Sequence, residues 1–311
     1  MTASGIAATP VGSAYLAAKD LEQPLAEELA QAGVAVGAWH GRLALSPDPP
    51  FASVWALDVW TAPQVHGVVS VKAAAGLLRQ QQRNWSAYAA LHHRRTALIE
   101  SCLSPVRARP LRFPEPAPTS HLGAWTLVDR DQLLASPTKS SPFPMGECRF
   151  EEDRAGPPSR AYLKLWEALT RLGTHPGPGD KCLDLGAAPG GWTWALARLG
   201  ASVRAVDRAP LDLRVAAMPG VEQIIGSAFA MVPEPVDWLV CDVVAYPARV
   251  LDLMRRWIAA GAARRIVCTV KFQGATDHVT AQAFAALPHG RLTHLFHNKH
   301  ELTFLWVEPG S

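Results

Sequence analysis

Four charged side chains stand out because their places in the sequence could bring them to one site. Asp242 follows the apolar run VDWLVC, Lys271 follows RRIVCTV, and Glu301 begins the last apolar run of the chain. If these runs are strands of an open α/β sheet, such positions lie near the sheet edge that binds ligands. Lys164 lies on a helix predicted to begin at Ser159. It projects away from the apolar face of that helix, which consists of Tyr162, Leu165, Trp166, Leu169 and Leu172.

Each of these residues also has an ordinary structural interpretation. Lys164 could be a solvated helix lysine, Asp242 a strand-end cap and Glu301 a hairpin charge, while Lys271 could extend its amine from a strand tip into water. Together, two lysines and two carboxylates suit proton removal from a weakly acidic hydroxyl, which needs a base and firm alignment. We assign Lys271 as the base. A nearby lysine and partial desolvation favour its neutral form, whereas Asp242 and Glu301 orient it.

A glycine-rich segment, Asp184-Leu-Gly-Ala-Ala-Pro-Gly-Gly-Trp192, follows one predicted strand and opens a helix. Glycines let the backbone approach a ligand, and the first N–H groups of the helix face its polar end. Asp207 ends the next strand, where it could accept hydrogen bonds from ribose hydroxyls. The spacing GxxxGG differs from the GxGxxG of dinucleotide enzymes and favours S-adenosylmethionine over NAD. A glycine-rich turn without a ligand is the alternative. The predicted cofactor contacts in this segment are Gly186, Ala188, Pro189, Gly190, Gly191 and Trp192.

The second half of the chain alternates short apolar runs with helical stretches. The expected elements are Cys182 to Leu185, Trp192 to Leu199, Ser202 to Val206, Val221 to Ile225, Val236 to Cys241, Val250 to Ala259 and Ile266 to Val270. This rhythm predicts a mostly parallel sheet covered on both faces. The runs 291–296 and 302–307 are too close for a crossover helix, so they should form an antiparallel hairpin. The expected fold class is α/β, in the Rossmann-like class I methyltransferase pattern, with a mostly parallel seven-stranded sheet.

The first half suggests a smaller α/β module. Its expected strands are 14–17, 34–38 and 53–60, around a helix over 23–32. Between Arg79 and Arg109 the spacing of Trp85, Tyr88, Leu91 and Leu98 predicts a helix with a core stripe. Its basic face would be solvated or would contact phosphates. The arginines of this segment are Arg79, Arg83, Arg94, Arg95, Arg107 and Arg109. The proline- and serine-rich stretch 105–158 is expected to be a linker, interrupted by the strand-like AWTLVDRDQLL.

Composition narrows the class of protein. The chain has 311 residues, 49% of them hydrophobic and 18% charged, and a net charge of +3, which favours a soluble globular protein over a disordered one. No apolar stretch reaches the roughly 18 residues that a membrane span needs. The N-terminus does not resemble a secretory signal, so we expect a cytoplasmic protein. The five cysteines are scattered and should be reduced, mostly buried thiols, and neither they nor the 11 histidines suggest a metal site.

At these residues the chain resembles the bacterial ribosomal RNA ribose 2′-O-methyltransferases of the RlmM type, within the FtsJ-like group. The resemblance covers the catalytic half and is close there. The motifs fall in family order: Ser-Pro-Phe-Pro-Met-Gly (141–146), Ser-Arg-Ala-Tyr-Leu-Lys-Leu (159–165), the glycine-rich segment, Cys-Asp-Val-Val-Ala-Tyr-Pro (241–247), and the contexts of Lys271 and Glu301. The SPFPMG element distinguishes this subgroup from its relatives.

The resemblance implies roles for individual residues. Lys271 would accept the proton, and Lys164, Asp242 and Glu301 would complete a catalytic tetrad. The implied substrate is a cytidine of large-subunit ribosomal RNA. In Ile-Ile-Gly-Ser-Ala-Phe (224–229) this chain has a hydroxyl where the family pattern has an acidic residue that meets the adenine. The residues implied to contact S-adenosylmethionine are Ser159, Ala188, Pro189, Gly190, Gly191, Asp207 and Asp242, with Ser227 and Phe229 at the adenine.

The resulting domain prediction has three parts. Residues 1–110 form an N-terminal α/β region, a reduced counterpart of the family's THUMP-like RNA-binding region. Residues 111–158 form a linker that includes SPFPMG, and residues 159–311 form the catalytic domain. The expected partner is large-subunit ribosomal RNA, with no metal, no membrane and a monomeric state. A non-catalytic RNA-binding or ribosome-assembly protein and a small-molecule methyltransferase are the alternatives.

Overall fold

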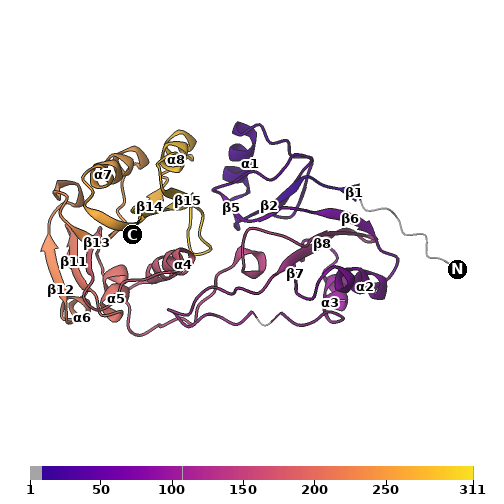
Figure 1. Cartoon of the computed structure of the whole chain (residues 1–311), viewed down its shortest axis with the longest axis horizontal. Helices are drawn as coiled ribbons and strands as arrows, with labels where there is room; N and C mark the ends of the chain where they lie inside the picture. The colour runs from indigo at the N-terminus through magenta and orange to yellow at the C-terminus, as the bar shows by residue number, and fades with distance from the viewer. Residues whose placement is uncertain (1–8, 107, 311) are drawn as a thin grey trace. The chain divides into compact units, whose positions relative to one another are not determined.

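The structure, a computed structural model, describes residues 9–106 and 108–310 (Figure 1). The chain divides into two compact units. The first contains the residues up to 110 together with 117–149, and the second contains 111–116 together with the residues from 150 onward. Each unit has its own sheets and core and is described by itself.

The second unit is built on a seven-stranded sheet with the order β12-β11-β10-β13-β14-β16-β15. The first five strands in this order are parallel, and β16 and β15 run antiparallel to their neighbours. This arrangement confirms the predicted fold class, including the closing hairpin. The strands are β10 (Lys181–Leu185), β11 (Ser202–Asp207), β12 (Val221–Ile225), β13 (Val236–Cys241), β14 (Ala263–Lys271), β15 (Gly290–Thr293) and β16 (Glu301–Val307).

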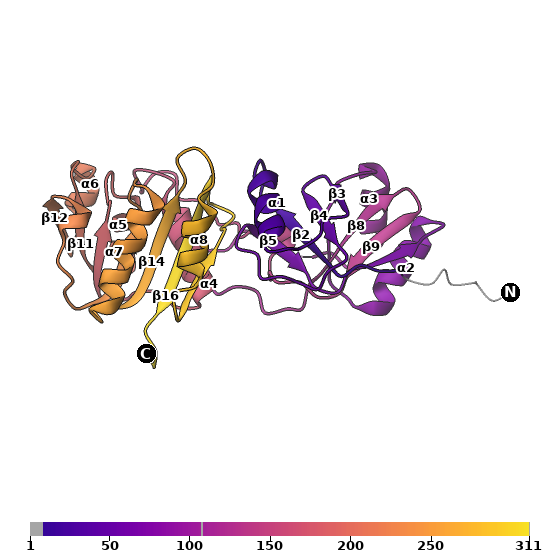
Figure 2. The same ribbon diagram turned by 90° about the horizontal axis from the view of Figure 1, so that it is seen from above.

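Helices cover both faces of this sheet, which explains why its central strands are continuous apolar runs. On one face lie α4 (Tyr162–Leu172), α5 (Gly191–Arg198) and α6 (Leu213–Ala216), and on the other α7 (Pro247–Ala259) and α8 (His278–Ala285) (Figure 1). Figure 2 shows α7 and α8 side by side over their face. A 3₁₀ turn, η2 (Ala228–Ala230), follows β12. The loops after the parallel strands therefore gather at one edge, where the site is built.

The first unit contains two sheets. The five-stranded sheet has the order β1-β6-β9-β8-β7, and the four-stranded sheet has the order β3-β4-β2-β5. Its strands are β1 (Thr9–Pro10), β2 (Ser13–Ala17), β3 (Ala38–His40), β4 (Leu43–Ser46), β5 (Ala56–Trp60), β6 (Gln64–Gly67), β7 (Trp85–Ala87), β8 (Gly123–Asp129) and β9 (Gln132–Ser136). Its helices are α1 (Glu22–Gln31), α2 (Val71–Gln81), α3 (His93–Glu100) and the 3₁₀ turn η1 (Pro144–Gly146).

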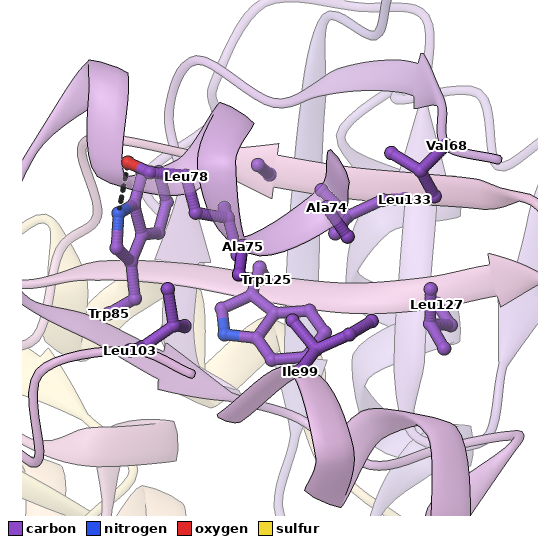
Figure 3. Close-up of a cluster of buried hydrophobic side chains, with 11 residues drawn as sticks. Val68, Ala74, Ala75, Leu78, Trp85, Ile99, Leu103, Trp125, Leu127 and Leu133 are labelled. Carbon is purple, nitrogen blue, oxygen red and sulfur yellow. Dashed lines mark hydrogen bonds between the residues drawn. The ribbon is translucent and has the colours of Figure 1, made fainter. Parts of the chain in front are cut away.

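The helices α2 and α3 pack on the five-stranded sheet through a buried cluster (Figure 3). Trp125 of β8 is fully buried there, and the indole N–H of Trp85 donates to the carbonyl of Leu78 at 2.8 Å. Buried indoles contribute large apolar areas to a core. The cluster consists of Val68, Ala74, Ala75, Leu78, Trp85, Ile99, Leu103, Trp125, Leu127, Leu133 and Ala135.

The helix predicted across Trp85 to Leu98 is wrong in its first half. Trp85 begins the short strand β7, which pairs in parallel with β8, and α3 begins only at His93. Trp85 and Tyr88 are buried, but Leu91 and Leu98 are exposed, so the four do not form one stripe. Pairing with a strand nearly 40 residues later overrides the local helical spacing. Arg107 lies outside the described residues.

The expected linker over 111–158 also needs correction. Its strand-like part forms β8 and β9, which complete the five-stranded sheet, and residues 117–149 belong to the first unit. Lys139 and Asp58, which are 1% and 0% exposed, form an ion pair at 2.7 Å that fastens the SPFPMG segment to β5. The Lys139 amine also donates to the carbonyls of Ser141 and Phe143. The SPFPMG segment is therefore part of the first unit, where it is held against β5, and is not a linker.

The predicted strands and helix of the first half agree with the structure in part. The strand at 14–17 and the helix at 23–32 are confirmed as β2 and α1. The strand expected at 34–38 begins only at Ala38, and the one expected at 53–60 begins at Ala56. The five cysteines are thiols, and all except Cys102 are buried. Among the described residues, no helix is long and apolar enough to cross a membrane.

Candidate active site

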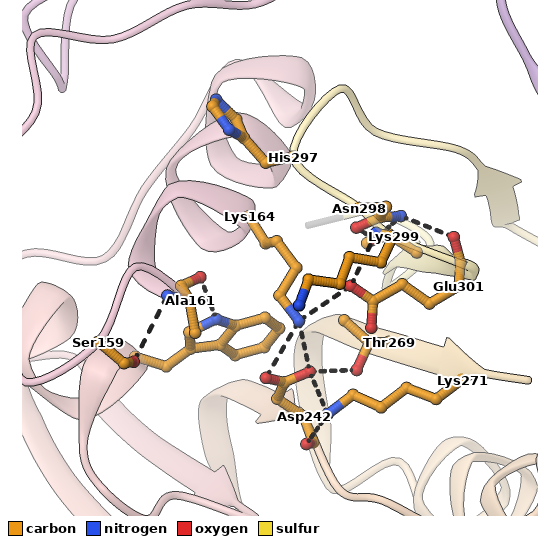
Figure 4. A network of polar contacts seen from close by, with 12 residues as sticks. Ser159, Ala161, Lys164, Asp242, Thr269, Lys271, His297, Asn298, Lys299 and Glu301 are labelled. Atoms are coloured by element: carbon orange, nitrogen blue, oxygen red, sulfur yellow. Dashed lines mark hydrogen bonds and ion pairs between the residues drawn. The ribbon is translucent and has the colours of Figure 1, made fainter. Parts of the chain in front are cut away.

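The four charged residues singled out in the sequence converge at one edge of the seven-stranded sheet (Figure 4). The Nζ atom of Lys164 lies 3.0 Å from Oδ1 and 3.2 Å from Oδ2 of Asp242, and 3.1 Å from Oε1 of Glu301. The Nζ atom of Lys271 lies 3.0 Å from Oδ1 of Asp242 and donates to the carbonyl oxygen of Asp242 at 2.6 Å. Asp242 is thus the common partner of both lysines.

The sheet topology explains this convergence. Asp242 directly follows β13, and Lys271 ends the neighbouring parallel strand β14. Because β16 runs antiparallel to β14, its first residue, Glu301, pairs in register with Lys271 at the same edge. Lys164 comes from α4, which is buried over most of its surface, so its amine extends toward the sheet edge. Lys271 and Glu301 therefore come from the ends of two strands, Asp242 from the residue after a third, and Lys164 from a helix.

A fifth polar side chain, Thr269, belongs to the cluster and was not identified from the sequence. Its hydroxyl donates to Oδ1 of Asp242 at 2.5 Å. Thr269 lies two residues before Lys271 on β14, and residues two apart on a strand point to the same face. That period-two spacing was the signal that could have found it.

Opposite charges outweigh burial in setting the protonation of this cluster. Burial by itself would raise the pKa of Asp242, but Lys164 and Lys271 hold that pKa below its usual value. Burial would likewise lower the pKa of Lys164, but Asp242 and Glu301 raise it. Lys164 is therefore an ammonium and Asp242 a carboxylate at neutral pH.

A second buried carboxylate, Glu167, fixes the segment that leads into Glu301. Glu167 is fully buried on α4, one turn after Lys164. Its carboxylate accepts hydrogen bonds from the backbone N–H groups of Phe296 at 3.0 Å and His297 at 3.1 Å. Arg171 donates to it at 2.9 Å. The same helix therefore carries Lys164 and holds the connection between β15 and β16, an arrangement that sequence periodicity did not indicate.

The glycine-rich turn lies beside this cluster. Gly186 has φ +80°, and a Cβ atom there would lie 2.9 Å from the backbone of Val243, the residue after Asp242. At Gly191, a Cβ atom would lie 2.6 Å from Oγ of Ser159. Glycine is required at position 186, where a Cβ atom would meet backbone and φ is left-handed, whereas at position 191 the close atom is a side-chain hydroxyl that can rotate. These contacts bring the turn together with Ser159 and with the loop after β13.

Two acidic residues border the glycine-rich turn. Asp207, at the end of β11, accepts from the backbone N–H groups of Ala188 and Ala209, each at 3.0 Å. Asp184 is fully buried, and its Oδ2 accepts from the Thr193 hydroxyl at 2.6 Å. Burial raises the pKa of Asp184 to about 7. No hydrogen-bond donor among the described residues reaches its Oδ1.

The predicted adenine contacts lie in the turn after β12. Ser227 precedes η2, and Phe229 lies within it. The guanidinium of Arg249, on α7, lies 3.8 Å from the centre of the Phe229 ring, and Arg256 donates to the carbonyl of Phe229 at 3.1 Å. Trp192 has a different environment. Its buried indole donates to the carbonyl of Ala161 at 2.8 Å, which joins α5 to the start of α4.

These features fit S-adenosylmethionine. Backbone amides at the start of α5 and the carboxylate of Asp207 suit the polar groups of a nucleoside-containing ligand. The unpaired Oδ1 of the buried Asp184 suits a ligand that carries positive charge. The residues present are therefore those that such a cofactor needs.

Comparison with known proteins agrees with the site. Residues 157–301 match the family model of the FtsJ-like methyltransferases. The chain carries an FtsJ-like methyltransferase domain. This assignment agrees with the observed sheet order, and S-adenosylmethionine, the cofactor predicted from the sequence, is the methyl donor of this class of domain.

The curated relatives share both sequence and name. The chain is 36% identical over 196 residues to "Ribosomal RNA large subunit methyltransferase M" of Laribacter hongkongensis, covering 57% of this chain and 55% of that protein. It is 41% identical over 140 residues to the protein of the same name from an Azoarcus species, covering 43% and 38% of the two chains. The chain spans about half the length of the curated relatives it matches.

Among solved structures, a ribosomal RNA methyltransferase, putative, from Plasmodium falciparum aligns with a TM-score of 0.37 and 12% identity. The alignment covers 48% of this chain and 97% of the other. The methyltransferase domain is assigned from its sequence family and its own sheet order.

Proposed function

We propose that this protein is an S-adenosylmethionine-dependent methyltransferase that modifies a ribose 2′-hydroxyl, at a cytidine, in large-subunit ribosomal RNA. The observation that carries the proposal is the convergence of Lys164 and Lys271 on one carboxylate, Asp242, beside the glycine-rich turn. The relatives named as ribosomal RNA large subunit methyltransferases support the choice of substrate.

We assign different roles to the two lysines because their contacts differ. Lys164 contacts two carboxylates, which raise its pKa and make it a poor proton acceptor. Lys271 contacts one carboxylate, shared with Lys164, so both amines lie within about 6 Å of each other. Because Lys271 contacts one carboxylate where Lys164 contacts two, Lys271 is the amine that we assign to accept the proton of the ribose hydroxyl.

The remaining residues position the reaction. Asp242 and Glu301 orient the amines, and Lys164 as an ammonium holds both carboxylates in place. Asp207 would hold ribose hydroxyls of the cofactor, and Ser227 and Phe229 would contact its adenine. The cofactor supplies an electrophilic methyl group. The bond between that methyl carbon and the sulfonium sulfur would break as the ribose oxygen takes the methyl group, and the cofactor would leave as a neutral thioether. The hydroxyl proton would pass to Nζ of Lys271, a type of assistance worth about 10² to 10⁴ in rate.

A methyl-transfer assay tests this function. Radiolabelled S-adenosylmethionine and large-subunit RNA lacking the modification should yield labelled RNA, and mass spectrometry of digested RNA should locate the methyl group on a ribose oxygen. Lys271→Ala should lower the rate of transfer by about 10²- to 10⁴-fold while S-adenosylmethionine binding, measured by calorimetry, is retained. A Lys271→Ala variant as fast as the parent would remove the proposed base. Cofactor binding without any transfer by the parent would favour a non-catalytic RNA-binding protein, and transfer to a free metabolite would favour a small-molecule methyltransferase.

We also propose that the first unit binds the RNA. On α3, Arg94 is exposed, which suits a phosphate contact. Arg95 instead donates to the carbonyl of Val68 at 3.2 Å, and Arg79 donates to the carbonyl of Cys102 at 2.9 Å. Part of the basic segment therefore supports the unit's own backbone, and Arg94 is the better candidate for phosphate binding.

A further inference from the structure

Two large apolar side chains are exposed immediately beside the candidate active site. Val244 is 75% exposed and Tyr246 is 72% exposed, and both belong to the loop that joins Asp242 to α7. Their neighbours in the loop are buried or small: Val243 is 8% exposed, and residue 245 is an alanine. The loop therefore presents alternate residues outward.

Backbone contacts hold this loop at both ends. The backbone N–H of Asp242 donates to the carbonyl of Leu185 at 3.0 Å, and Val243 packs against Gly186. At the other end the carbonyl of Tyr246 accepts from the N–H of Arg249 at 3.0 Å, and Pro247 is buried in the first turn of α7. Val244 and Tyr246 thus belong to a loop that is fixed at both ends, and Asp242 is its first residue.

We propose that Tyr246, with Val244 beside it, forms a platform on which an unstacked base of the RNA substrate lies during methyl transfer. The inference rests on the proposed function and specifies how its substrate is held. The outward side chains of this loop carry no charge, so they are unsuited to phosphate and suited to the flat face of a base. Aromatic side chains hold single-stranded RNA in this way, by stacking against the flat face of a base.

The position of the platform gives it a mechanistic consequence. Tyr246 lies four residues after Asp242, the carboxylate that both lysines contact. A base resting on Tyr246 keeps its nucleotide, or the adjacent one, from turning away from Lys271. Alignment of this kind accounts for a large part of enzymatic rate enhancement. Stacking is tolerant of base identity, so the platform holds a base without choosing which one.

The test compares Tyr246→Ala and Tyr246→Phe with the parent, using large-subunit RNA lacking the modification. Tyr246→Ala should raise KM for RNA about 5- to 100-fold, in line with the loss of one stacked base. Tyr246→Phe keeps the ring and should stay within about twofold of the parent. Calorimetric affinity for S-adenosylmethionine should not change in either variant. Val279→Ala is the matched control, because Val279 is 79% exposed on α8 of the same unit.

RNA binding measured without turnover separates failure of this inference from failure of the proposed function. With S-adenosylhomocysteine present, Tyr246→Ala should bind labelled RNA more weakly than the parent, and ultraviolet crosslinking should place RNA on a peptide containing Tyr246. If the parent methylates RNA and Tyr246→Ala matches it in KM and binding, the platform is refuted and the function stands. If the parent transfers no methyl group but Tyr246→Ala still weakens RNA binding, the function fails and the platform stands. Loss of self-association with unchanged RNA binding would also refute the platform.

Discussion

Replacing Lys164 with methionine removes the cation that links Asp242 to Glu301. The side chains of these three residues are between 8% and 15% exposed, so water replaces the ammonium only in part. Removing one partner of a buried ion pair typically costs about 3–5 kcal/mol. If that loss appears in the transition state, kcat/KM for RNA falls by about 10²- to 10⁴-fold.

The pH dependence of the same variant gives a sharper test. In the parent, the pKa of Asp242 is below its usual value despite burial, because Lys164 and Lys271 favour the carboxylate. A carboxylate with a depressed folded-state pKa stabilises the fold above its unfolded pKa, and this contribution is lost as pH falls through the folded pKa. Burial raises the pKa of Asp242, and the charges of Lys164 and Lys271 oppose that effect. Without Lys164 only one of these charges remains, so the pKa of Asp242 rises. The acid limbs of both kcat/KM and folding stability should therefore move to higher pH.

The assays are methyl transfer and denaturant unfolding, each measured from about pH 3 to 9, because the pKa of Asp242 in the parent lies below its usual range. Lys164→Arg keeps the charge and should restore part of the parent's acid limb, although its planar head group cannot reproduce the point contact of an ammonium. Lys181→Met is the matched control, because Lys181 is exposed at the start of β10. An acid limb and a kcat/KM in Lys164→Met that equal those of the parent would refute the assigned role of Lys164.

Three further predictions concern other parts of the chain. Glu167→Gln replaces one acceptor oxygen with an N–H donor that faces the donors of Phe296, His297 or Arg171. The variant should lower kcat by about 10- to 100-fold and keep its affinity for S-adenosylmethionine. An equal loss of kcat in Arg171→Met would assign the effect to the ion pair between Glu167 and Arg171 alone. Lys139→Met should lower the free energy of unfolding of the first unit by about 3–5 kcal/mol in denaturant unfolding. Lys19→Met is the control, because Lys19 is exposed. A loss of stability no larger than that of the control would contradict a stabilising role for the ion pair between Lys139 and Asp58. Arg94→Ala should weaken RNA binding without altering S-adenosylmethionine affinity. The dependence of RNA affinity on salt concentration should become shallower by about one phosphate contact. An unchanged salt dependence would mean that Arg94 is only a solvated surface residue.

The sequence by itself determined most of the second unit. Apolar runs with turn residues between them predicted the five parallel strands and the final hairpin, because strands buried on both faces leave an unmistakable apolar signature. It also placed Asp242, Lys271 and Glu301 at one edge. The carboxyl ends of parallel strands meet there, and an antiparallel partner begins where its neighbour ends.

Tertiary structure decided what local pattern leaves open. Trp85 fits a helical spacing with Tyr88, yet it pairs as a strand with Gly123, because the free energy of sheet pairing and burial exceeds a weak local preference. The burial of Lys139 with Asp58 and the tether from Glu167 to the segment before Glu301 join residues more than 80 positions apart. No periodicity within one element records such a contact. Helix periodicity could show that Lys164 faces away from the apolar stripe, but only the packing of α4 over the sheet edge decided that its amine meets Asp242 and Glu301.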